Sequence, residues 1–451
     1  MIPVVTPAEM RAIDAAAAES EAQLVDRAGA AVARVARTML GGTYGRVVNV
    51  IVGPGNNGAD GRVAADRLEQ RGVKVRVFEV ATCPAALPPA DLVIDAAFGT
   101  GFHGIWRAPI IGDAMVLAVD IPSGVDGITG SASSGTLRAD VTVTFAAAKP
   151  GLYLGKGRQL AGDIQVVDIG LDVSSATAHV VEASDVSGWI GRRGGDAHKW
   201  AQAVRVVAGS SGMTGAAHLV TAGAQRAGAG MVHVSSPGVE GDPPIEAVSR
   251  RIPGFDWADA VLNDLYRFHS LVVGPGLGRA DHTVPSVTKL VIDAIVPVVV
   301  DGDGLFALAW NEHGAPTMLL SREVPTILTP HDGEYALLTG HRPSDDRLAA
   351  TRQLATDTGA TVLLKGPTTV VASPAGEARL VVNGDERLAT AGTGDVLAGI
   401  IGALAASGLD ALTAGAAGAW LHASAASFGP SRGFVASDLL AHLPDALAAL
   451  D

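Results

Sequence analysis

The chain has 451 residues, a length typical of two or three domains, and 48% of them are hydrophobic. Its formal net charge of −13 argues against a nucleic-acid-binding role. Cys83 is the single cysteine, which excludes an intramolecular disulfide and suits a reducing cytoplasm. Charged residues interrupt the first 40 positions and the apolar runs are short, so we expect neither an export signal nor a membrane span.

The first part of the chain alternates short runs of branched aliphatic residues with helical patterns. This order predicts a mainly parallel sheet covered by helices, preceded by an Ala-rich helix pair over about residues 6–39. The expected strands are 46–52, 73–80, 91–95, 115–120, 140–145 and 164–169, with a helix over 60–71 between the first two.

The composition changes near residues 184–196, where glycine and arginine cluster without a period. We place a domain boundary there, which gives domains of 1–188 and 189–451. A second α/β series follows the boundary. Its expected strands are 204–208, 231–235, 271–273, 297–301, 325–328 and 361–365, and its expected helices are 214–228, 283–294, 344–358, 394–407, 411–428 and 435–449.

The loop after the first strand reads VGPGNNGADG, residues 52–61, and has glycines in the G-x-G-x-x-G spacing. Glycines let backbone N–H groups approach a phosphate, and the helix that follows adds its positive end. The spacing alone is a weak signal, because a tight strand-to-helix turn also uses glycines. Asn56, Asn57 and Asp60 favour a binding loop, since a turn does not need three polar side chains.

Two acids end neighbouring strands of the first series. In open α/β sheets, ligands bind beyond the carboxyl ends of the strands. Asp95 and Asp120 both lie there before glycine-rich loops, so a shared site is favoured over two separate caps. With Asn57 and Ser123 they offer hard oxygen ligands that suit a cation such as K⁺ or Mg²⁺. Lys149, in AAAKPG, either balances these acids or is a solvated surface lysine.

Similar loops follow the strands of the second series. AGSSGMTGAA at 208–217 and GPGLG at 274–278 each come between a strand and a helix. TPHDGE presents His331 at a strand end, where a ligand contact and a structural role are equally open. KGPTT sets Lys365 before two hydroxyls, as a grip on a phosphate or nucleotide would require.

The segment ATAGTGDVLAG, residues 389–399, is the strongest functional signal. Its N–H groups would form an anion-binding concavity at a helix N-terminus. Asp395 beside a bound anion could deprotonate a hydroxyl as that oxygen attacks phosphorus. The alternative is an acid that only interacts with the helix dipole, worth about 0.3–1 kcal/mol. Gly392 and Gly394 argue against it, because they weaken the helix start.

Together these motifs resemble a known family. GPGNNGADG, DIPSGVDG and KPGL are similar to the Rossmann-like epimerase domain of the bifunctional NAD(P)H-hydrate repair enzymes. AGSSGMTGAA, GPGLG, LTPHDGE and AGTGDVLAG resemble their ribokinase-like, ADP-dependent dehydratase domain. The resemblance implies an α/β fold with the domains in that order. It also implies an enzyme that interconverts the R and S hydrates of NADH and NADPH, then dehydrates the S form while ADP becomes AMP and phosphate.

The resemblance further implies site residues. Potassium would be held in the epimerase domain by Asn57, Asp95 and Ser123. The hydrate would contact that domain at Asp120 and at Asn56, Asn57, Gly58, Ala59, Asp60, Gly99, Thr100, Gly101, Phe102, His103, Gly104 and Ile105. In the dehydratase domain it would contact Ala217, Gly276 or Gly278, His331 and Asp395. ADP, with Mg²⁺, would contact Lys365, Gly366, Pro367, Thr368, Thr369 and Gly394.

For catalysis we assign Asp395 as the dehydratase base, and Asp120 as the epimerase acid and base with Lys149 as a second candidate. The partners expected are NADHX, NADPHX and ADP, with no nucleic acid and no membrane, in a cytoplasmic homo-oligomer. Ala59 and Trp200 stand where the family has glycine. Two alternatives remain open, a ribokinase-like small-molecule kinase fused to a nucleotide-binding domain, and a non-catalytic nucleotide sensor.

Overall fold

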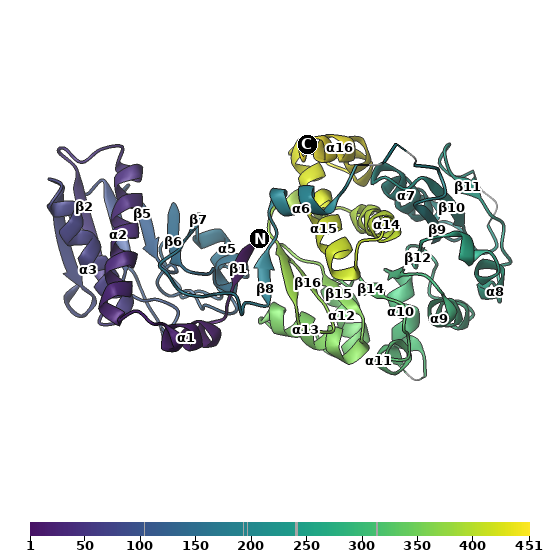
Figure 1. The fold of residues 1–451 in the computed structure, drawn as a ribbon, viewed down its shortest axis with the longest axis horizontal. Coiled ribbons are helices and arrows are strands. Elements are labelled where there is room, and N and C mark those ends of the chain that lie inside the picture. Colours follow the sequence, from purple (N-terminus) through teal and green to yellow (C-terminus); the bar gives the residue numbers. More distant parts are fainter. Residues whose placement is uncertain (103, 193, 196, 240–241, 313) are drawn as a thin grey trace. The chain divides into compact units, whose positions relative to one another are not determined.

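The computed structural model describes residues 1–451 except 103, 193, 196, 240–241 and 313. It divides into two compact units (Figure 1). The N-terminal unit is Ile2–His179, and the C-terminal unit is Val180–Asp451 together with Met1.

The N-terminal unit is built on a parallel sheet in the order β3-β2-β4-β5-β6-β7. The central strands β2, β4, β5 and β6 are mostly buried, as expected where helices and loops cover both faces, whereas the edge strands β3 and β7 are more exposed. From β2 the chain continues to β3 on one side, and from β4 it continues to β5 on the other side. The strand order therefore reverses between β2 and β4. The elements are β1 (Ile2–Val4), α1 (Pro7–Ala16), α2 (Glu21–Leu40), β2 (Val47–Val52), α3 (Asn56–Glu69), β3 (Lys74–Glu79), β4 (Leu92–Ala96), β5 (Met115–Val119), β6 (Val141–Phe145), α4 (Pro150–Tyr153), α5 (Gly157–Leu160), β7 (Asp163–Val167) and β8 (Ala178–Val180).

The C-terminal unit has a larger sheet, with strands in the order β17-β16-β15-β14-β13-β12-β9-β10-β11. The strands from β15 to β11 run parallel, and β15, β16 and β17 pair antiparallel. The elements are α6 (Ala183–Trp189), β9 (Ala203–Val207), α7 (Thr214–Arg226), β10 (Met231–Ser235), β11 (Val248–Ser249), α8 (Ala258–Leu262), β12 (Ser270–Val273), α9 (Thr283–Asp293), β13 (Val298–Val300), α10 (Asp303–Trp310), α11 (Gly314–Leu319), β14 (Thr326–Leu328), α12 (Asp332–Thr339), α13 (Arg347–Thr358), β15 (Thr361–Leu364), β16 (Thr369–Ala372), β17 (Ala378–Val381), α14 (Thr393–Ala406), α15 (Ala411–Phe428) and α16 (Ala436–Ala448).

Each unit has a helix-covered core. In the N-terminal unit, α2 and α3 pack on one face of the sheet, where Val32, Val50 and Leu68 belong to one buried cluster. In the C-terminal unit, α7, α14, α15 and α16 share a buried cluster with sheet residues such as Val204 and Val272 (Figure 1). Because the helices cover the faces of the two sheets, the carboxyl ends of the strands are bordered by the connecting loops.

The expected α/β fold with largely parallel sheets is confirmed, with local differences. Helix α3 begins at Asn56, four residues before the predicted start at 60, because the polar NNGAD stretch enters the helix after Gly55. The hairpin of β16 and β17 was not predicted, and Thr369, expected in a nucleotide loop, is the first residue of β16.

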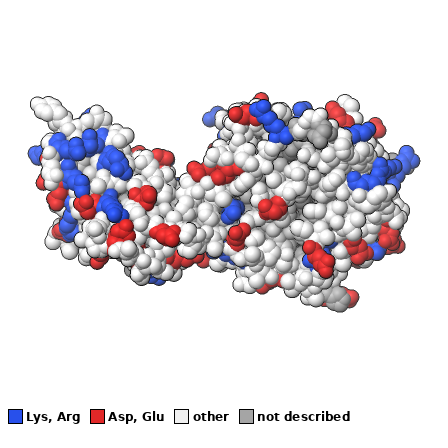
Figure 2. All heavy atoms as spheres, viewed as in Figure 1, with Lys and Arg blue, Asp and Glu red and all other residues white. Residues whose placement is uncertain are grey.

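Figure 2 shows basic side chains gathered over α2 and α3, with acidic side chains among them. Two of the contacts there are ion pairs, Arg67 with Asp26 at 2.6 Å and Arg62 with Glu79 at 2.6 Å. The basic residues of this face are thus partly neutralised. Within the described part of the chain, no helix combines the length and apolarity needed to cross a bilayer.

Candidate active sites

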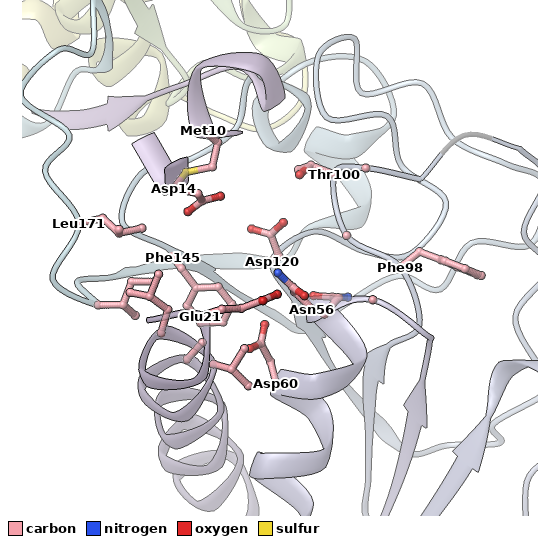
Figure 3. A pocket seen from close by; sticks show the side chains of 18 of the residues that line it. Met10, Asp14, Glu21, Asn56, Asp60, Phe98, Thr100, Asp120, Phe145 and Leu171 are labelled. Atoms are coloured by element: carbon pink, nitrogen blue, oxygen red, sulfur yellow. The ribbon is translucent and has the colours of Figure 1, made fainter. Parts of the chain in front are cut away.

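A cavity of about 1000 Å³ opens in the N-terminal unit at the point where the strand order reverses. Ligands of open parallel sheets bind at such points. Its walls come from the loops after β2, β4, β5, β6 and β7, from α1 and α2, and from the start of α3. Figure 3 shows the carboxyl groups of Asp14, Glu21, Asp60 and Asp120 turned toward this space.

The glycines of the first loop serve different purposes. A Cβ on Gly53 would lie 1.8 Å from the Ala97 carbonyl oxygen, and one on Gly58 would lie 2.0 Å from that of Gly53. These two glycines are therefore required by the close packing of β2, α3 and the end of β4. Gly55 faces open space and lines the cavity. Ala59 lies within α3, where its Cβ is accommodated, so the departure from glycine causes no backbone strain.

Asp120 and Lys149 form a buried pair at the floor of the cavity. Lys149 Nζ lies 2.6 Å from Asp120 Oδ1 and also donates to Thr144 Oγ1 at 2.9 Å and to the Phe145 carbonyl at 3.3 Å. The Lys149 side chain is 2% exposed and that of Asp120 is 16% exposed. Asp120 has a φ of +66°, in the left-handed region that non-glycine residues adopt rarely. Lys149 is therefore not a solvated surface lysine.

Further acids face this pair. Burial, with the nearby charge of Asp120, raises the pKa of Asp60 to about 8 against the opposing effect of Lys149. Burial also raises the pKa of Asp14, which Lys149 partly offsets. Asp14 and Glu21 were missed by the sequence analysis because they come from α1 and α2, away from any strand end.

The predicted potassium ligands lie beside the cavity. Asp95 and Ser123 are fully buried, and Asp95 Oδ2 accepts the Ser123 backbone N–H at 2.9 Å. Burial raises the pKa of Asp95, while its hydrogen bonds to Ser123 work in the other direction. Asn57 is buried, and neither atom of its amide has a hydrogen-bond partner among the described residues. A buried amide oxygen without a donor is what a bound cation would satisfy, so these residues fit potassium.

The structure does not bring every predicted residue of this site to the cavity wall. The wall includes Asn56, Asn57, Asp60, Gly99, Thr100, Gly101, Phe102, Asp120 and Lys149. Gly58, Ala59, Gly104 and Ile105 are not among its lining residues, and the Ile105 side chain is 90% exposed. His103 lies outside the described residues.

In the C-terminal unit, the first turn of α14 meets the ends of β13 and β15. Lys365 Nζ lies 2.5 Å from Asp301 Oδ1, which also accepts the Thr329 hydroxyl at 2.8 Å. A Cβ on Gly394 would lie 3.3 Å from Lys365 Nζ and 3.8 Å from Asp301 Oδ2. Lys365 and Gly394, both predicted nucleotide contacts, are therefore neighbours, and Asp395 is the next residue along α14.

Carboxyl groups crowd this region. Burial raises the pKa of Asp395 to about 6, and the charge of Asp301 adds to this while Lys365 opposes it. Burial also raises the pKa of Glu334. For Lys365, burial favours the neutral amine, but Asp301 and Glu334 outweigh it and raise the pKa, so the ammonium is retained.

The glycine loops of this unit converge on the same region. The Gly278 N–H donates to Asp303 Oδ2 at 2.9 Å, and Asp303 contributes to the raised pKa of Asp395. Gly276 packs against α7, where an added Cβ would lie 2.7 Å from that of Ala216. Ala217 is buried and lines a small pocket with Thr214.

His331 has a structural role. It is the N-cap of α12, and its Nδ1 accepts the N–H groups of Gly333 at 2.9 Å and Glu334 at 3.2 Å. The side chain is 59% exposed, so the ring also has a free side. Glu334 in turn interacts with Lys365, which connects this cap to the α14 region.

The segment from Lys365 to Thr369 is only partly accessible. Gly366 and Pro367 are exposed, whereas Thr368 is buried. Arg347, which the sequence analysis missed, donates from Nη2 to the Lys365 carbonyl at 2.7 Å and from Nη1 to Asp332 at 2.8 Å. Helix α13, which directly precedes β15 in the chain, therefore holds the start of this segment.

Trp200, the second departure from the family pattern, takes part in an aromatic cluster. Its ring packs edge-on against His233 and Phe268, and the Arg267 guanidinium lies 4.4 Å from the ring centre. Glycine could not make these contacts, so Trp200 packs the edge of the unit around β10.

Comparisons with known proteins cover both units. The family model described as NAD(P)H-hydrate dehydratase matches residues 204–447, and the model described as YjeF-related protein N-terminus matches residues 21–87 and 78–151. The bifunctional NAD(P)H-hydrate repair enzyme Nnr of Mycobacterium leprae is 37% identical, with 91% of this chain and 90% of that one covered. The enzyme of the same name from Moorella thermoacetica is 35% identical, with 99% and 97% covered.

Solved structures match the C-terminal unit. The ADP/ATP-dependent NAD(P)H-hydrate dehydratase of Bacillus subtilis, co-crystallised with ATP/Mg²⁺, has a TM-score of 0.51 at 27% identity and covers 60% of this chain and 98% of its own. A ribokinase-like superfamily protein of Enterococcus faecalis has a TM-score of 0.53 at 21% identity, covering 61% and 96%, and supports the fold alone. Similarity along the whole chain favours the repair enzymes over the kinase and the nucleotide sensor. The chain therefore belongs to the bifunctional NAD(P)H-hydrate repair enzymes, and it is an NAD(P)H-hydrate epimerase and dehydratase with a Rossmann-like N-terminal unit and a ribokinase-like C-terminal unit.

Proposed function

We propose that the dehydratase of this chain converts ADP to AMP and phosphate and that Asp395 is its base. The observation that carries this proposal is the position of Asp395 at the start of α14, beside Lys365. A pKa of about 6 leaves Asp395 ionised near pH 7 and makes it a stronger base than an ordinary aspartate. The Bacillus subtilis relative, named as ADP/ATP-dependent, supports a nucleotide bound with Mg²⁺ as the second substrate.

This proposal implies the following chemistry. Asp395 takes the proton of the hydroxyl on the hydrated ring while that oxygen attacks the β-phosphorus of ADP, and AMP leaves. The ring then carries a phosphate ester, which departs more readily than hydroxide. The ring nitrogen supplies the electron pair that expels phosphate, and loss of a proton from the adjacent carbon restores the dihydropyridine. Lys365 and the N–H groups of Gly394 and its neighbours would stabilise the phosphate charge.

We propose that Asp120, held by Lys149, is the acid and base of the epimerase. Loss of the hydroxyl and addition of water to the other ring face would exchange the R and S forms, with Asp120 transferring the protons. Potassium at Asn57, Asp95 and Ser123 would supply a fixed positive charge beside the cavity. The unsatisfied Asn57 amide supports this. The role of the remaining predicted contacts, including His331, Ala217 and Gly276, stays a prediction.

The test of the dehydratase is the variant Asp395→Asn. It should lose repair of the S form, measured as the return of reduced-nicotinamide absorbance with S-NADHX and ADP, by at least about 100-fold. R/S exchange, followed by chromatography, should be unchanged. Repair at the wild-type rate would remove Asp395 from its role. Recovery of AMP and phosphate, one of each per NADH, distinguishes repair from a kinase that releases a stable phosphorylated product.

The limits of the two domains at residues 188 and 189, the homo-oligomer and the cytoplasmic location stay predictions. The same absorbance assay, run separately with NADHX and with NADPHX, measures which hydrate the enzyme prefers.

A further inference from the structure

A buried carboxylate at the end of β13 is not explained by the roles above. Asp301 is 3% exposed, and its Oδ1 binds both Lys365 Nζ and the Thr329 hydroxyl. The Thr329 backbone N–H donates to the Val300 carbonyl at 3.2 Å, which fixes the residue at the end of the neighbouring strand. A carboxylate removed from water in this way needs its cationic partner, and the lysine in turn is held in one position.

This position matters because of what lies next to it. The Lys365 ammonium and the second oxygen of Asp301 both face Gly394, where any Cβ would approach them. The charged and titratable groups around this point come from six elements. They are Asp301 after β13, Asp303 on α10, Glu334 on α12, Lys365 after β15, Asp395 on α14 and His422 on α15. Of these six groups, Lys365 is the one that carries a positive charge near pH 7.

We propose that Asp301 is a positioning residue of the dehydratase, which holds Lys365 over the first turn of α14 and offsets its charge so that Asp395 stays basic. Without Asp301, the ammonium would be free to pair with Asp395 and weaken it as a base. It would also lose its fixed place beside the nucleotide phosphate. This inference rests on the proposed function of Asp395 and Lys365.

The test is the pH dependence of a single turnover of S-NADHX, with enzyme in excess and ADP saturating, for Asp301→Asn and Lys365→Gln. Asp301→Asn removes one negative charge, so the midpoint of the acid limb should fall by about one pH unit. Lys365→Gln removes the positive charge, so the midpoint of its residual activity should rise. Loss of structure cannot give shifts of opposite sign. The KM for ADP should rise about tenfold in Asp301→Asn.

Two further variants separate charge from position. Asp301→Glu keeps the charge but moves it by one methylene, so it should leave the midpoint unchanged and raise the KM for ADP several-fold. If Asp301→Asn does not fold, Asp301→Glu replaces it as the test. A wild-type KM for ADP in Asp301→Glu would then overturn the proposal. Asp293→Asn, an exposed acid paired with Lys289 on α9, is the control and should change neither value.

The outcomes distinguish the two proposals. If Asp301→Asn has the wild-type acid-limb midpoint and the wild-type KM for ADP while Asp395→Asn is inactive, the role of Asp301 is refuted and that of Asp395 is unaffected. Activity in Asp395→Asn would refute the proposed base itself.

Discussion

At the scale of single residues, the Asp120–Lys149 pair is asymmetric. The lysine is nearly inaccessible, whereas the aspartate side chain reaches the cavity. Removing one member of a buried pair leaves the other uncompensated, and the cost depends on how much water the remaining charge can reach. Of its partners among the described residues, Lys149 would keep the Thr144 hydroxyl and the Phe145 carbonyl.

We therefore expect Asp120→Asn to lower the free energy of unfolding of the N-terminal unit by about 3 kcal/mol, and Lys149→Met to lower it by less. The double variant should recover part of the loss, because it leaves no buried charge. Urea unfolding followed by circular dichroism measures all three. If Lys149→Met lowers the free energy of unfolding more than Asp120→Asn does, then the Asp120 carboxylate, and not the Lys149 ammonium, is the group that is costly to leave without its partner.

Several acids of the two candidate sites could be picked out from the sequence because they end apolar strands. Asp95 and Asp120 were found by this rule, and the same rule applied to VVVDGDG would have found Asp301. Asp14 and Arg347 could not be found in this way, since they lie on helices and not at the ends of strands. Their roles depend on tertiary packing that no local pattern records.

At the scale of elements, α7 and α14 pack with almost no space between their backbones. A Cβ on Gly223 of α7 would lie 2.6 Å from the Val396 carbonyl oxygen, and one on Gly399 of α14 would lie 2.1 Å from that of Val220. This contact carries the first turn of α14, so it also places Asp395. Gly215, near the start of α7, has nothing within 4 Å of the same position.

These glycines give a matched pair of substitutions. Gly223→Ala should lower the free energy of unfolding of the C-terminal unit by about 1–3 kcal/mol, because a backbone atom cannot move aside as a side chain can. Gly215→Ala should raise it by up to about 1 kcal/mol, because alanine favours the helix. The transition midpoint in urea is the measurement, and equal effects of the two changes would contradict the packing described.

His422 holds the same helix start from α15. It is buried, and its Nε2 donates to the Thr393 carbonyl at 2.8 Å. Burial lowers its pKa from 6.5 to about 4. The unfolded chain therefore binds more protons than the folded one between about pH 6.5 and 4, so this residue makes stability fall as the pH falls through that range.

The substitution His422→Leu should remove that dependence. Near pH 7 it should cost about 1–3 kcal/mol, because the Thr393 carbonyl loses its donor. The gap to wild type should narrow as the pH approaches 4, where the wild type loses up to about 3 kcal/mol to protonation of the unfolded chain. Urea unfolding at pH 4.5, 5.5 and 7 measures the gap, and a constant difference would show that His422 is not held neutral.

The elements predicted best were those with long apolar runs, such as β2 and α14. The β16–β17 hairpin was missed because four-residue strands separated by a short turn resemble loops in sequence. The early start of α3 was missed because asparagine and glycine usually favour turns over helices. In both cases pairing or packing with distant parts of the chain outweighs the local preference.

At the scale of the whole molecule, the two family models match separate parts of the chain, and each unit contains its own group of candidate residues. The cavity of the N-terminal unit is lined by residues of that unit alone. The Lys365, Asp301 and Asp395 cluster lies within the C-terminal unit. Neither site as described needs a side chain from the other unit, so the S hydrate made by one could reach the other through solution.

Complementation between two inactive variants tests this separation. Asp120→Asn should repair S-NADHX with ADP but not R-NADHX, and Asp395→Asn should repair neither while still exchanging the two forms. An equimolar mixture should repair R-NADHX, and the rate, followed by the return of reduced-nicotinamide absorbance, should exceed that of either variant alone at least about tenfold. The spontaneous exchange of R and S, measured without enzyme, is the baseline. If the mixture is no faster than Asp120→Asn alone, the intermediate does not pass between molecules, and the two sites of one chain must be coupled directly.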